Sequence, residues 1–496
     1  MPTLFRQRKR DCVSRQKGLA HAHPVAVAAA PSSHHSLFAF IGVHLRLILL
    51  SALLGLAAIG TAWAAYPPFQ PLVDAAEPGA VLVPEPGTYA GPVVVDKAIT
   101  IDGQDQVTID AGGKGTVILL DTDGATLKNL RLVNSGTSHN DIDSGVQVRG
   151  KFNVIRDNRI EDTLFGIDLQ QSNNNIVRRN HIVSKPVELG VRGDAIRLWY
   201  SFNNQITDNV VRDSRDIVIW YSRDNLIARN DARGGRYSLH FMYSQYNRVE
   251  DNYFEDNTVG IFVMYSDGVV LKNNTIVNAH GPTGVCLGLK ESSDLVIEGN
   301  RMLYCADGVY IDVSPYQPET TNVFRDNLIA YNGVGVRWLN DWYGNTFTGN
   351  WFQGNTTQIV VEGGKTANRN TWHGNFWDDY QGFDRDGDGI GDTPYELYAY
   401  ADRLWMDVPP AQFFKATPML EVLDFIERLA PTTEPSLLVR DPQPLRAAAI
   451  DVGELTVPAP TMAVDEYAEP KAEAPVPAAS GGYDALEALR QSLGRD

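Results

Sequence analysis

The sequence predicts an all-β protein that forms a right-handed parallel β-helix, a solenoid with coils of about 22 residues. Two recurring features predict this fold: a phrase of alternating apolar residues that ends in Ser, and a pair of Asn residues between successive phrases. The serines follow one another at intervals of 29, 21, 22, 22, 26 and 22 residues. They are Ser172, Ser201, Ser222, Ser244, Ser266, Ser292 and Ser314.

The second recurring feature has the form Asn, four residues, Asn. Asn accepts a left-handed backbone at a turn, and its amide can hydrogen-bond to the equivalent Asn of the next coil. Leucine-rich repeats have a similar period, but their Leu and Asn consensus is missing here and Ile and Val dominate the strands. We therefore expect the β-helix within residues 65–380, with repeated coils from about residue 80 to 375. The pairs are Asn153/Asn158, Asn175/Asn180, Asn204/Asn209, Asn225/Asn230, Asn247/Asn252, Asn322/Asn327, Asn345/Asn350 and Asn370/Asn375.

The first 64 residues have the features of a secretory signal peptide. Basic residues at 5–10 precede the apolar run 47–60, and Ala62-Trp63-Ala64 supplies the small residues of a cleavage site. A membrane anchor is the alternative, but the run is shorter than the roughly 20 residues that a span requires. We expect cleavage after Ala64 and a periplasmic mature protein, so the histidines upstream of this point are not candidate metal ligands.

Charge and cysteine content limit the possible partners. The chain has 43 Lys and Arg residues against 60 Asp and Glu residues, which argues against nucleic acid as a partner because phosphate binding needs a basic face. Cys286 and Cys305 remain after removal of the signal peptide. In an oxidising compartment they could form a disulfide, or they could be two small buried apolar side chains. The sequence leaves both possibilities open.

The alternation within each phrase assigns its residues to two faces. Residues five and three positions before each Ser are apolar and should point inward, so residues four and two positions before it should point outward. The outward column two positions before the Ser contains soft and aromatic side chains, which is typical of a binding surface. It reads Gln170, Trp199, Trp220, Met242, Met264, Lys290 and Asp312.

A copper site is predicted within this outward column. His240 and Met242 share the outer face of one strand, and Met264 should stack on Met242 from the next coil at the strand spacing of about 4.8 Å. Thioether sulfur favours Cu(I), and imidazole also suits copper. The alternative is that both Met side chains fill a groove against a loop while His240 hydrogen-bonds to a neighbour.

A calcium-type loop follows the last coil, in the phrase "DRDGDGIGDTPYE". It has Asp at positions 1, 3 and 5, Gly at 6 and Asp at 9, as in the first half of an EF-hand loop, but Tyr395 replaces the Glu expected at position 12. The alternative is a solvated acidic turn. The ligands predicted for a structural Ca²⁺ are Asp384, Asp386, Asp388, the carbonyl of Ile390, and Asp392.

The chain after this loop predicts one helix and then disorder. Thr417 and Pro418 suit a helix N-terminus, and apolar residues of "MLEVLDFIERLA" fall along one face. We expect residues 381–445 to combine the calcium-type loop with a helical segment that either docks on a permease or caps the β-helix. Residues 446–496 are rich in Pro, Ala and Glu and are predicted to be disordered.

Three phrases, "LHFMYSQYNRVEDN", "NFWDDYQGFDRDGDGIGDTPY" and "LEVLDFIERLAP", resemble the NosD family of nitrous oxide reductase maturation proteins. The resemblance runs from roughly residue 70 to 445. It implies a periplasmic, non-enzymatic protein that handles copper while the copper-sulfur centres of nitrous oxide reductase, NosZ, are assembled. The implied partners are an ABC transporter with permease NosY and ATPase NosF, and the copper chaperone lipoprotein NosL. The only contact with the membrane would be through the permease.

A periplasmic carbohydrate-binding or carbohydrate-modifying β-helix protein is the competing hypothesis. Trp199 and Trp220 could stack on a sugar, and outward or nearby carboxyl groups could act as acid and base. Asp168 and Asp312 lie far apart along the predicted helix axis, however, and Asp194 and Asp216 are one position out of register. Since no close carboxylate pair is predicted, the sequence favours a protein that is not an enzyme.

Overall fold

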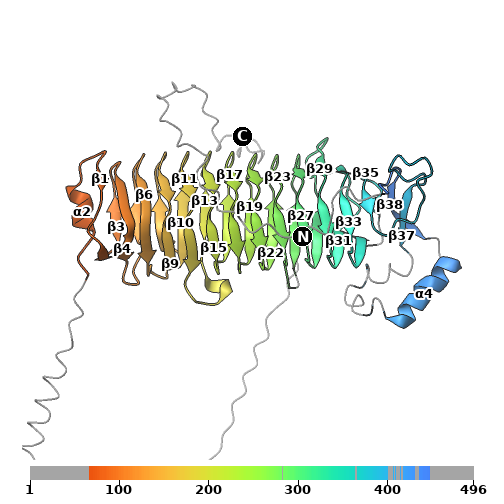
Figure 1. Cartoon of the computed structure of the whole chain (residues 1–496), viewed down its shortest axis with the longest axis horizontal. Helices are drawn as coiled ribbons and strands as arrows, with labels where there is room; N and C mark the ends of the chain where they lie inside the picture. Colours follow the sequence, from red (N-terminus) through yellow and green to blue (C-terminus); the bar gives the residue numbers. More distant parts are fainter. Residues whose placement is uncertain are drawn as a thin grey trace, which may run out of the picture. The chain divides into compact units, whose positions relative to one another are not determined.

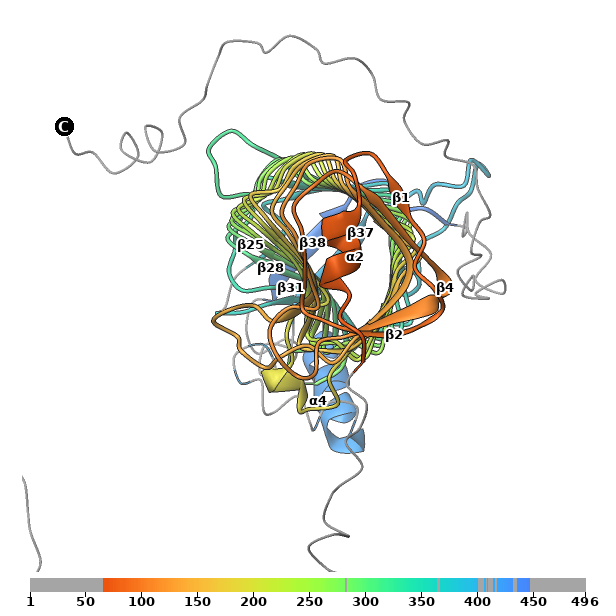
Figure 2. The ribbon, with the colours of Figure 1, turned by 90° about the vertical axis from the view of Figure 1, so that its left-hand side faces the viewer.

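The computed structural model describes residues 66–281, 283–363, 366–399, 406, 408, 414, 417–430 and 435–446. The predicted signal peptide and residues 447–496 of the predicted tail lie outside the described residues. Within the described part, the chain winds into a right-handed parallel β-solenoid, which confirms the predicted fold. Successive coils place their strands side by side (Figure 1) and wind around a common interior (Figure 2), which is filled by apolar side chains. No helix in these residues is long and apolar enough to cross a membrane.

One face of the solenoid is a parallel sheet with 12 strands, called sheet B below. Each coil contributes one strand to it. The strands are β3 (Val93–Val95), β5 (Ile118–Leu120), β7 (Ser144–Val148), β10 (Phe165–Gln170), β13 (Ile196–Trp199), β16 (Asp216–Trp220), β19 (Tyr237–Met242), β22 (Val259–Met264), β25 (Val285–Lys290), β28 (Asp307–Asp312), β31 (Val334–Trp338) and β34 (Thr357–Val361).

The second sheet has 24 strands in two parallel rows, and the long strands β4 (Thr100–Asp110) and β6 (Thr126–Val133) extend through both rows. The first row also holds β1 (Val81–Leu82), β8 (Val154–Arg156), β11 (Ile176–Arg178), β14 (Gln205–Thr207), β17 (Leu226–Ala228), β20 (Arg248–Glu250), β23 (Val270–Lys272), β26 (Val296–Glu298), β29 (Asn322–Arg325), β32 (Asn345–Thr348) and β35 (Thr371–His373). The second row also holds β2 (Gly87–Ala90), β9 (Arg159–Thr163), β12 (His181–Ser184), β15 (Val210–Arg212), β18 (Asp231–Arg233), β21 (Tyr253–Glu255), β24 (Thr275–Val277), β27 (Arg301–Leu303), β30 (Leu328–Ala330), β33 (Trp351–Gln353) and β36 (Phe376–Trp377).

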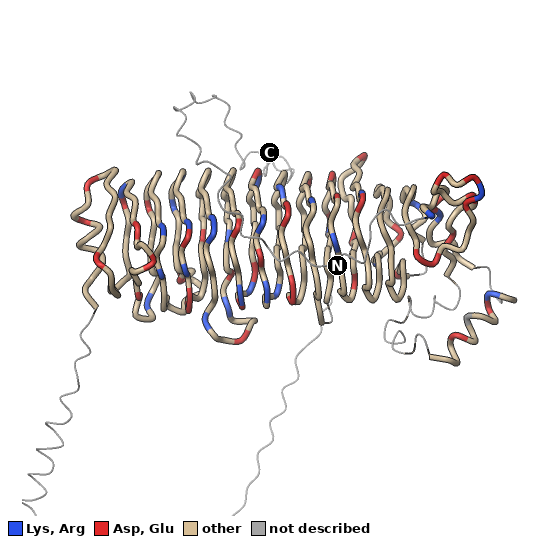
Figure 3. The backbone as a smooth tube through the Cα atoms, viewed as in Figure 1, with Lys and Arg blue, Asp and Glu red and all other residues tan. Residues whose placement is uncertain are grey.

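The interior is built from stacked apolar columns. The residues five and three positions before each Ser are buried, as predicted, and they align with their equivalents in the next coil, for example Ile196 with Ile217. Acidic and basic residues lie next to one another along the outer surface of the coils (Figure 3), where many form ion pairs.

The recurring Asn side chains form hydrogen-bonded ladders between coils. The second Asn residues of the pairs form the longer ladder. In it, the Oδ1 atom of one Asn accepts hydrogen bonds from the backbone and side-chain nitrogens of the Asn in the preceding coil, as Asn209 does from Asn180 at 3.0 Å in both cases. These Asn residues are buried and do not have a left-handed backbone. Instead the residue just before them does, for example Asp208 with φ of 58°. The expectation that the repeated Asn itself occupies the left-handed position was therefore wrong.

Two coils lack the first Asn of the recurring pair. Asn274 and Asn300 continue the longer ladder, but Val269 and Leu295 stand where the first Asn of the pair would be. The apolar residues keep the corner buried, while the second Asn maintains the hydrogen bonds. A search for pairs could not find these coils because only half of the pair is present.

Cys286 and Cys305 form a disulfide, with their Cα atoms 5.8 Å apart. Cys286 lies on β25 and Cys305 lies just after β27, so the bond joins two sides of the interior, and both residues are buried. Of the two possibilities that the sequence left open, the structure has the disulfide.

Both ends of the apolar interior are covered. Helix α2 (Gln70–Ala75), with Phe69 just before it, packs against the first coils and buries Phe69 and Val73. At the other end β37 (Tyr395–Ala399) and β38 (Ser436–Asp441) form an antiparallel pair that adds Leu438 and Val439 to the core. Other helical elements in the described part of the chain include the short 3₁₀ turn η1 (Leu189–Val191) and the helix α4 (Pro418–Leu429).

Helix α4 begins at Pro418, as the sequence predicted, but the Thr417 side chain makes no capping hydrogen bond. Its apolar side chains are exposed, including Met419, Phe425 and Leu429 at 75, 61 and 69%. The strands β37 and β38 therefore cap the interior, and the apolar face of α4 does not contribute to the described core.

Candidate functional site

The three residues of the predicted copper site lie together on the outer face of sheet B. His240 and Met242 belong to β19, and Met264 belongs to β22. Met242 is aligned with Met264 in the register between these two strands, as predicted. On its other side Met242 is aligned with Trp220 of β16. Both Met side chains are partly exposed, whereas His240 is only 6% exposed.

His240 has no hydrogen-bond partner at either ring nitrogen, although both atoms are buried. The alternative in which His240 hydrogen-bonds to a neighbour is therefore wrong within the described residues. A buried polar group without a partner costs free energy, so it usually has a function or an unseen ligand. Burial lowers the pKa of His240 to about 4. The ring is therefore neutral at pH 7, and one nitrogen lone pair can bind a metal ion.

The walls around His240 are mostly apolar. Val218 and Phe262 are its neighbours in the strand register, before and after it along the sheet. The ring of Tyr237 stacks on the imidazole at a centroid distance of 4.8 Å, and the ring of Trp220 lies nearly perpendicular to it at 5.8 Å. Such an environment excludes water from the imidazole and favours a soft, weakly hydrated cation over a hard one.

A β-bulge brings Tyr237 next to His240. The register between β16 and β19 shifts after Asp216, so β19 holds one more residue than β16 at this point. Asp216 fixes the start of the bulge, because it accepts the backbone N–H of Tyr237 at 3.0 Å and forms an ion pair with Arg236. The sequence pattern did not reveal the bulge, so the role of Tyr237 was missed, whereas Phe262 lies four positions before its Ser, as His240 does, and could have been found from the repeat.

Four tyrosines run beside the Trp and Met side chains. Tyr200, Tyr221, Tyr243 and Tyr265 stack on one another at centroid distances of 4.9, 5.3 and 4.9 Å, and all four have left-handed backbones. After Met264 the soft character of the outer column ends, because the next residue is Lys290, which binds Asp312 at 2.7 Å. The two Met residues thus lie between an aromatic stretch and an ion pair.

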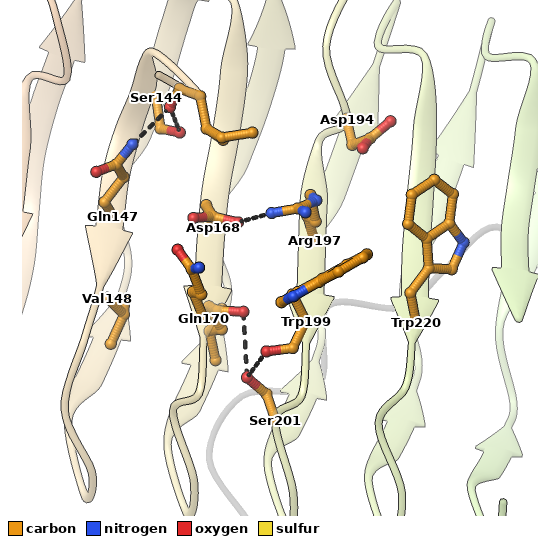
Figure 4. Close-up of polar contacts among 12 residues, drawn as sticks. Ser144, Gln147, Val148, Asp168, Gln170, Asp194, Arg197, Trp199, Ser201 and Trp220 are labelled. Atoms are coloured by element: carbon orange, nitrogen blue, oxygen red, sulfur yellow. Dashed lines mark hydrogen bonds and ion pairs between the residues drawn. The ribbon is translucent and has the colours of Figure 1, made fainter. Parts of the chain in front are cut away.

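Polar side chains of β7, β10 and β13, which include Gln147, Asp168 and Arg197, lie on the same face in earlier coils (Figure 4). Asp168 is fully buried between two guanidinium groups, those of Arg149 at 3.1 Å and Arg197 at 2.7 Å. The guanidinium of Arg197 also lies over the ring of Trp199, 4.9 Å from its centroid. The Asp168 carboxyl group is therefore held by cations on both sides, a poor arrangement for a general acid or base.

Asp194 and Asp216 are closer to each other than the sequence suggested, since Arg215 contacts both, at 2.8 and 3.7 Å. Burial raises the pKa of Asp194 to about 6. Each of the outward or nearby carboxyl groups considered for sugar chemistry is ion-paired with Lys or Arg. Among these four, no pair is free to flank a glycosidic bond as acid and base.

The calcium-type loop brings three of its predicted ligands together. Carboxyl oxygens of Asp384, Asp386 and Asp388 lie within 4.8 Å of one another. The side chain of Asp384 accepts the backbone N–H groups of Gly387 and Gly389, and Asp392 accepts that of Arg385 at 2.9 Å. The backbone N–H of Ile390 donates to Asp388 at 2.8 Å, so the backbone of this residue lies next to the cluster. The loop is largely exposed, so the alternative of a solvated acidic turn remains compatible with the same geometry.

Part of the sequence is similar to a known protein family and to two of its relatives. Residues 180–382 match the family model described as "Periplasmic copper-binding protein (NosD)". The chain is 28% identical, over 72% of its length and 86% of the relative's, to a "Probable ABC transporter binding protein NosD" from Pseudomonas aeruginosa. It is 24% identical, over 72% of its length and 85% of the relative's, to a protein of the same name from Stutzerimonas stutzeri.

Similar solved structures include the A-module of a mannuronan C-5 epimerase from Azotobacter vinelandii, with 17% identity and a TM-score of 0.44 over 60% of this chain and 92% of that one. A mannuronic acid-specific family 6 lyase from human gut microbiota has 14% identity and a TM-score of 0.43 over 62% of this chain and 84% of that one. Neither likeness bears on function. The family model covers the coils that hold His240, Met242 and Met264, and two relatives share its name, so these coils are similar to the NosD family, which is described as periplasmic copper-binding.

Proposed function

We propose that this chain is a non-enzymatic periplasmic protein that handles Cu(I) for the assembly of the copper-sulfur centres of nitrous oxide reductase, together with an ABC transporter. The observation that carries the proposal is His240, whose two buried ring nitrogens have no partner, next to the aligned Met242 and Met264. The family description as copper-binding and the relatives' names as ABC transporter binding proteins support it. The partners proposed from the resemblance are NosY, NosF, NosL and NosZ.

The chemistry of the three side chains suits copper transfer. An imidazole nitrogen and two thioether sulfurs are neutral, soft donors that favour Cu(I). Because the Met side chains are partly exposed while His240 is buried, the donors form a site that is open on one side. A partner's soft ligand could approach Cu(I) from that open side and exchange with a thioether, so that the copper never has to enter water.

A Cu(I) competition titration of residues 65–496 tests the proposal. We expect one Cu(I) per chain in the unmodified protein and strong loss of affinity in a Met242→Leu/Met264→Leu variant. Removal of residues that only support metal ligands costs about 10 to 100-fold in affinity, so the loss of two ligands should cost at least about 100-fold. Met302→Leu is the matched control, because Met302 is fully buried in the interior on β27. Equal affinity in the double variant and in the unmodified protein would refute this site.

We propose that the exposed apolar face of α4 docks on the transporter. This face includes five exposed apolar side chains, those of Met419, Val422, Phe425, Ile426 and Leu429. Exposed apolar clusters on proteins usually mark interaction sites. We expect Phe425→Ser/Leu429→Ser to abolish co-purification with the permease without changing Cu(I) affinity. The control Glu421→Gln/Glu427→Gln alters acidic side chains of the same helix and should leave co-purification intact. Docking through another surface would leave both variants bound.

We propose a structural Ca²⁺ at Asp384, Asp386, Asp388, the Ile390 carbonyl and Asp392. A ligand that binds only the folded state stabilises it, by about 2.7 kcal/mol at a hundredfold excess over its Kd. Calcium should therefore raise the midpoint of thermal unfolding of the unmodified protein but not that of Asp386→Asn/Asp388→Asn. Asp105→Asn, at an exposed position of β4 in an early coil, is the control and should respond like the unmodified protein. If calcium has the same effect on all three proteins, it binds elsewhere.

A further inference from the structure

The proposed copper site has a third buried polar atom without a hydrogen-bond partner, and this atom belongs to Trp220. Its indole Nε1 atom has no hydrogen-bond partner, as is true of both ring nitrogens of His240. Trp338 and Trp351 also have unpaired indole nitrogens, but their ring neighbours are Phe347 and Phe376. Among these tryptophans, only Trp220 has its ring against a histidine that lacks partners too.

The indole N–H of Trp220 faces the strand that carries His240 and Met242. Strand β16 lies between β13 and β19 in sheet B. Figure 4 draws the Trp220 nitrogen on the side away from Trp199 of β13, which is the side of β19. The nearly perpendicular ring planes of Trp220 and His240, at 87°, agree with an indole whose edge is directed toward the imidazole. The N–H is thus a fixed donor next to the predicted ligands.

The donors predicted for Cu(I) leave its charge uncompensated. Imidazole and thioether groups are neutral, so Cu(I) bound to His240, Met242 and Met264 would keep a full positive charge in a mostly apolar environment. Asp216 is close enough to act on the pKa of His240, but its carboxylate is already paired with Arg236 and Arg215. An anion that enters with the metal would neutralise this charge, and it would need a hydrogen-bond donor.

We propose that Trp220 binds a soft monoanion, which occupies the fourth coordination position of Cu(I) and accepts a hydrogen bond from the indole Nε1–H. The chemical class is a heavier halide or a small thiolate, since soft donors match Cu(I) and an indole N–H can only donate. This inference rests on the proposed copper site. It assigns to Trp220 the role of a specificity-determining residue, for the anion that accompanies the metal.

The test compares Cu(I) affinity with and without bromide in a buffer that contains no other halide. The free Cu(I) concentration is set by a competing chelator. Trp220→Phe keeps the aromatic ring and removes the N–H, and Trp199→Phe makes the same change one coil earlier in the same outward column. Hydrogen bonds to charged groups are stronger than neutral ones, so bromide should raise the affinity of the unmodified protein and of Trp199→Phe by roughly tenfold or more. In Trp220→Phe most of this bromide-dependent increase, taken as the ratio of the affinities with and without bromide, should be lost.

Copper X-ray absorption supplies a second readout that does not depend on affinity. Bromine is a heavy neighbour, and its signal should appear in the first coordination shell of the unmodified protein and weaken in Trp220→Phe. Methanethiolate replaces bromide in a parallel arm, and a response to the thiolate alone would identify the anion as a sulfur ligand. The inference is overturned if Cu(I) binds through His240, Met242 and Met264 but neither anion changes affinity or enters the shell. If no Cu(I) binds at all, the proposed function fails first.

Discussion

Replacement of His240 by Leu is expected to stabilise the metal-free protein and to abolish Cu(I) binding at the same time. A buried polar group without a partner costs about 1 to 3 kcal/mol, and an apolar side chain of similar size removes this cost. The neighbours Val218 and Phe262 are apolar, so Leu suits the space. We expect an increase of about 1 to 2 kcal/mol in the free energy of unfolding, measured by urea denaturation at pH 7.5.

The control for this variant is His373→Leu, at an exposed position on β35 that should leave stability nearly unchanged. A loss of stability in His240→Leu, with Cu(I) binding retained, would mean that the imidazole serves the fold and not the metal. A residue that is kept at a cost to stability and is needed for metal binding is the pattern expected at a functional site.

The pH dependence of stability follows from the pKa of His240, which burial lowers to about 4. The unfolded chain binds this proton near pH 6.5, whereas the folded protein resists it until about pH 4. Protons therefore favour the unfolded state, and stability should fall as the pH drops from about 6.5 to about 4, by about 3 kcal/mol for this one group. The His240→Leu variant should lack this part of the decline, so its advantage over the unmodified protein should grow toward low pH.

The sequence was sufficient for the coils and for the alignment of Met242 with Met264, because both depend on strand alternation and on a regular repeat. It could not give the bulge after Asp216, since an extra residue within one strand looks the same as variation in a turn. The stacking of Tyr237 on His240 depends on that bulge. Whether His240 has a hydrogen-bond partner is also a property of three-dimensional neighbours, and it distinguishes the metal-site hypothesis from a structural histidine.

The elements that cap the end of the solenoid could not be predicted from the sequence either. The apolar pattern of α4 suggested a docking helix or a cap without deciding between them, whereas the actual cap uses β38, a strand that the sequence analysis did not identify. The strand pairs with β37, whose nearest residue lies more than 30 positions earlier in the chain. Local patterns carry no information about such a distant pairing.

Asp441 at the end of β38 is expected to be a stability-determining residue of the last coil. Its carboxyl group is fully buried. It takes the place of the next Asn in the longer ladder, because Oδ2 accepts hydrogen bonds from the backbone and side-chain nitrogens of Asn375, both at 2.9 Å. The same atom lies 3.3 Å from Nε1 of Trp377, and Oδ1 accepts the backbone N–H groups of Gly374 and Gln443 at 3.1 Å. One side chain thus satisfies donors from the last coil and from the chain that crosses it.

We expect Asp441→Ala to cost about 4 kcal/mol or more, because each buried donor left without an acceptor costs about 1 to 3 kcal/mol. Asp441→Asn retains one acceptor oxygen, enough to continue the ladder to Asn375, but presents an amide to the donors of Gly374 and Gln443, so it should lose about half as much. Asp96→Ala, at an exposed position near the other end, should have no measurable effect. Since each coil of a solenoid contacts only its neighbours, hydrogen exchange should accelerate first in β33, β35 and β36. Uniform exchange along all coils, or equal stability of the Ala and Asn variants, would show that the ladder does not depend on its terminal acceptor.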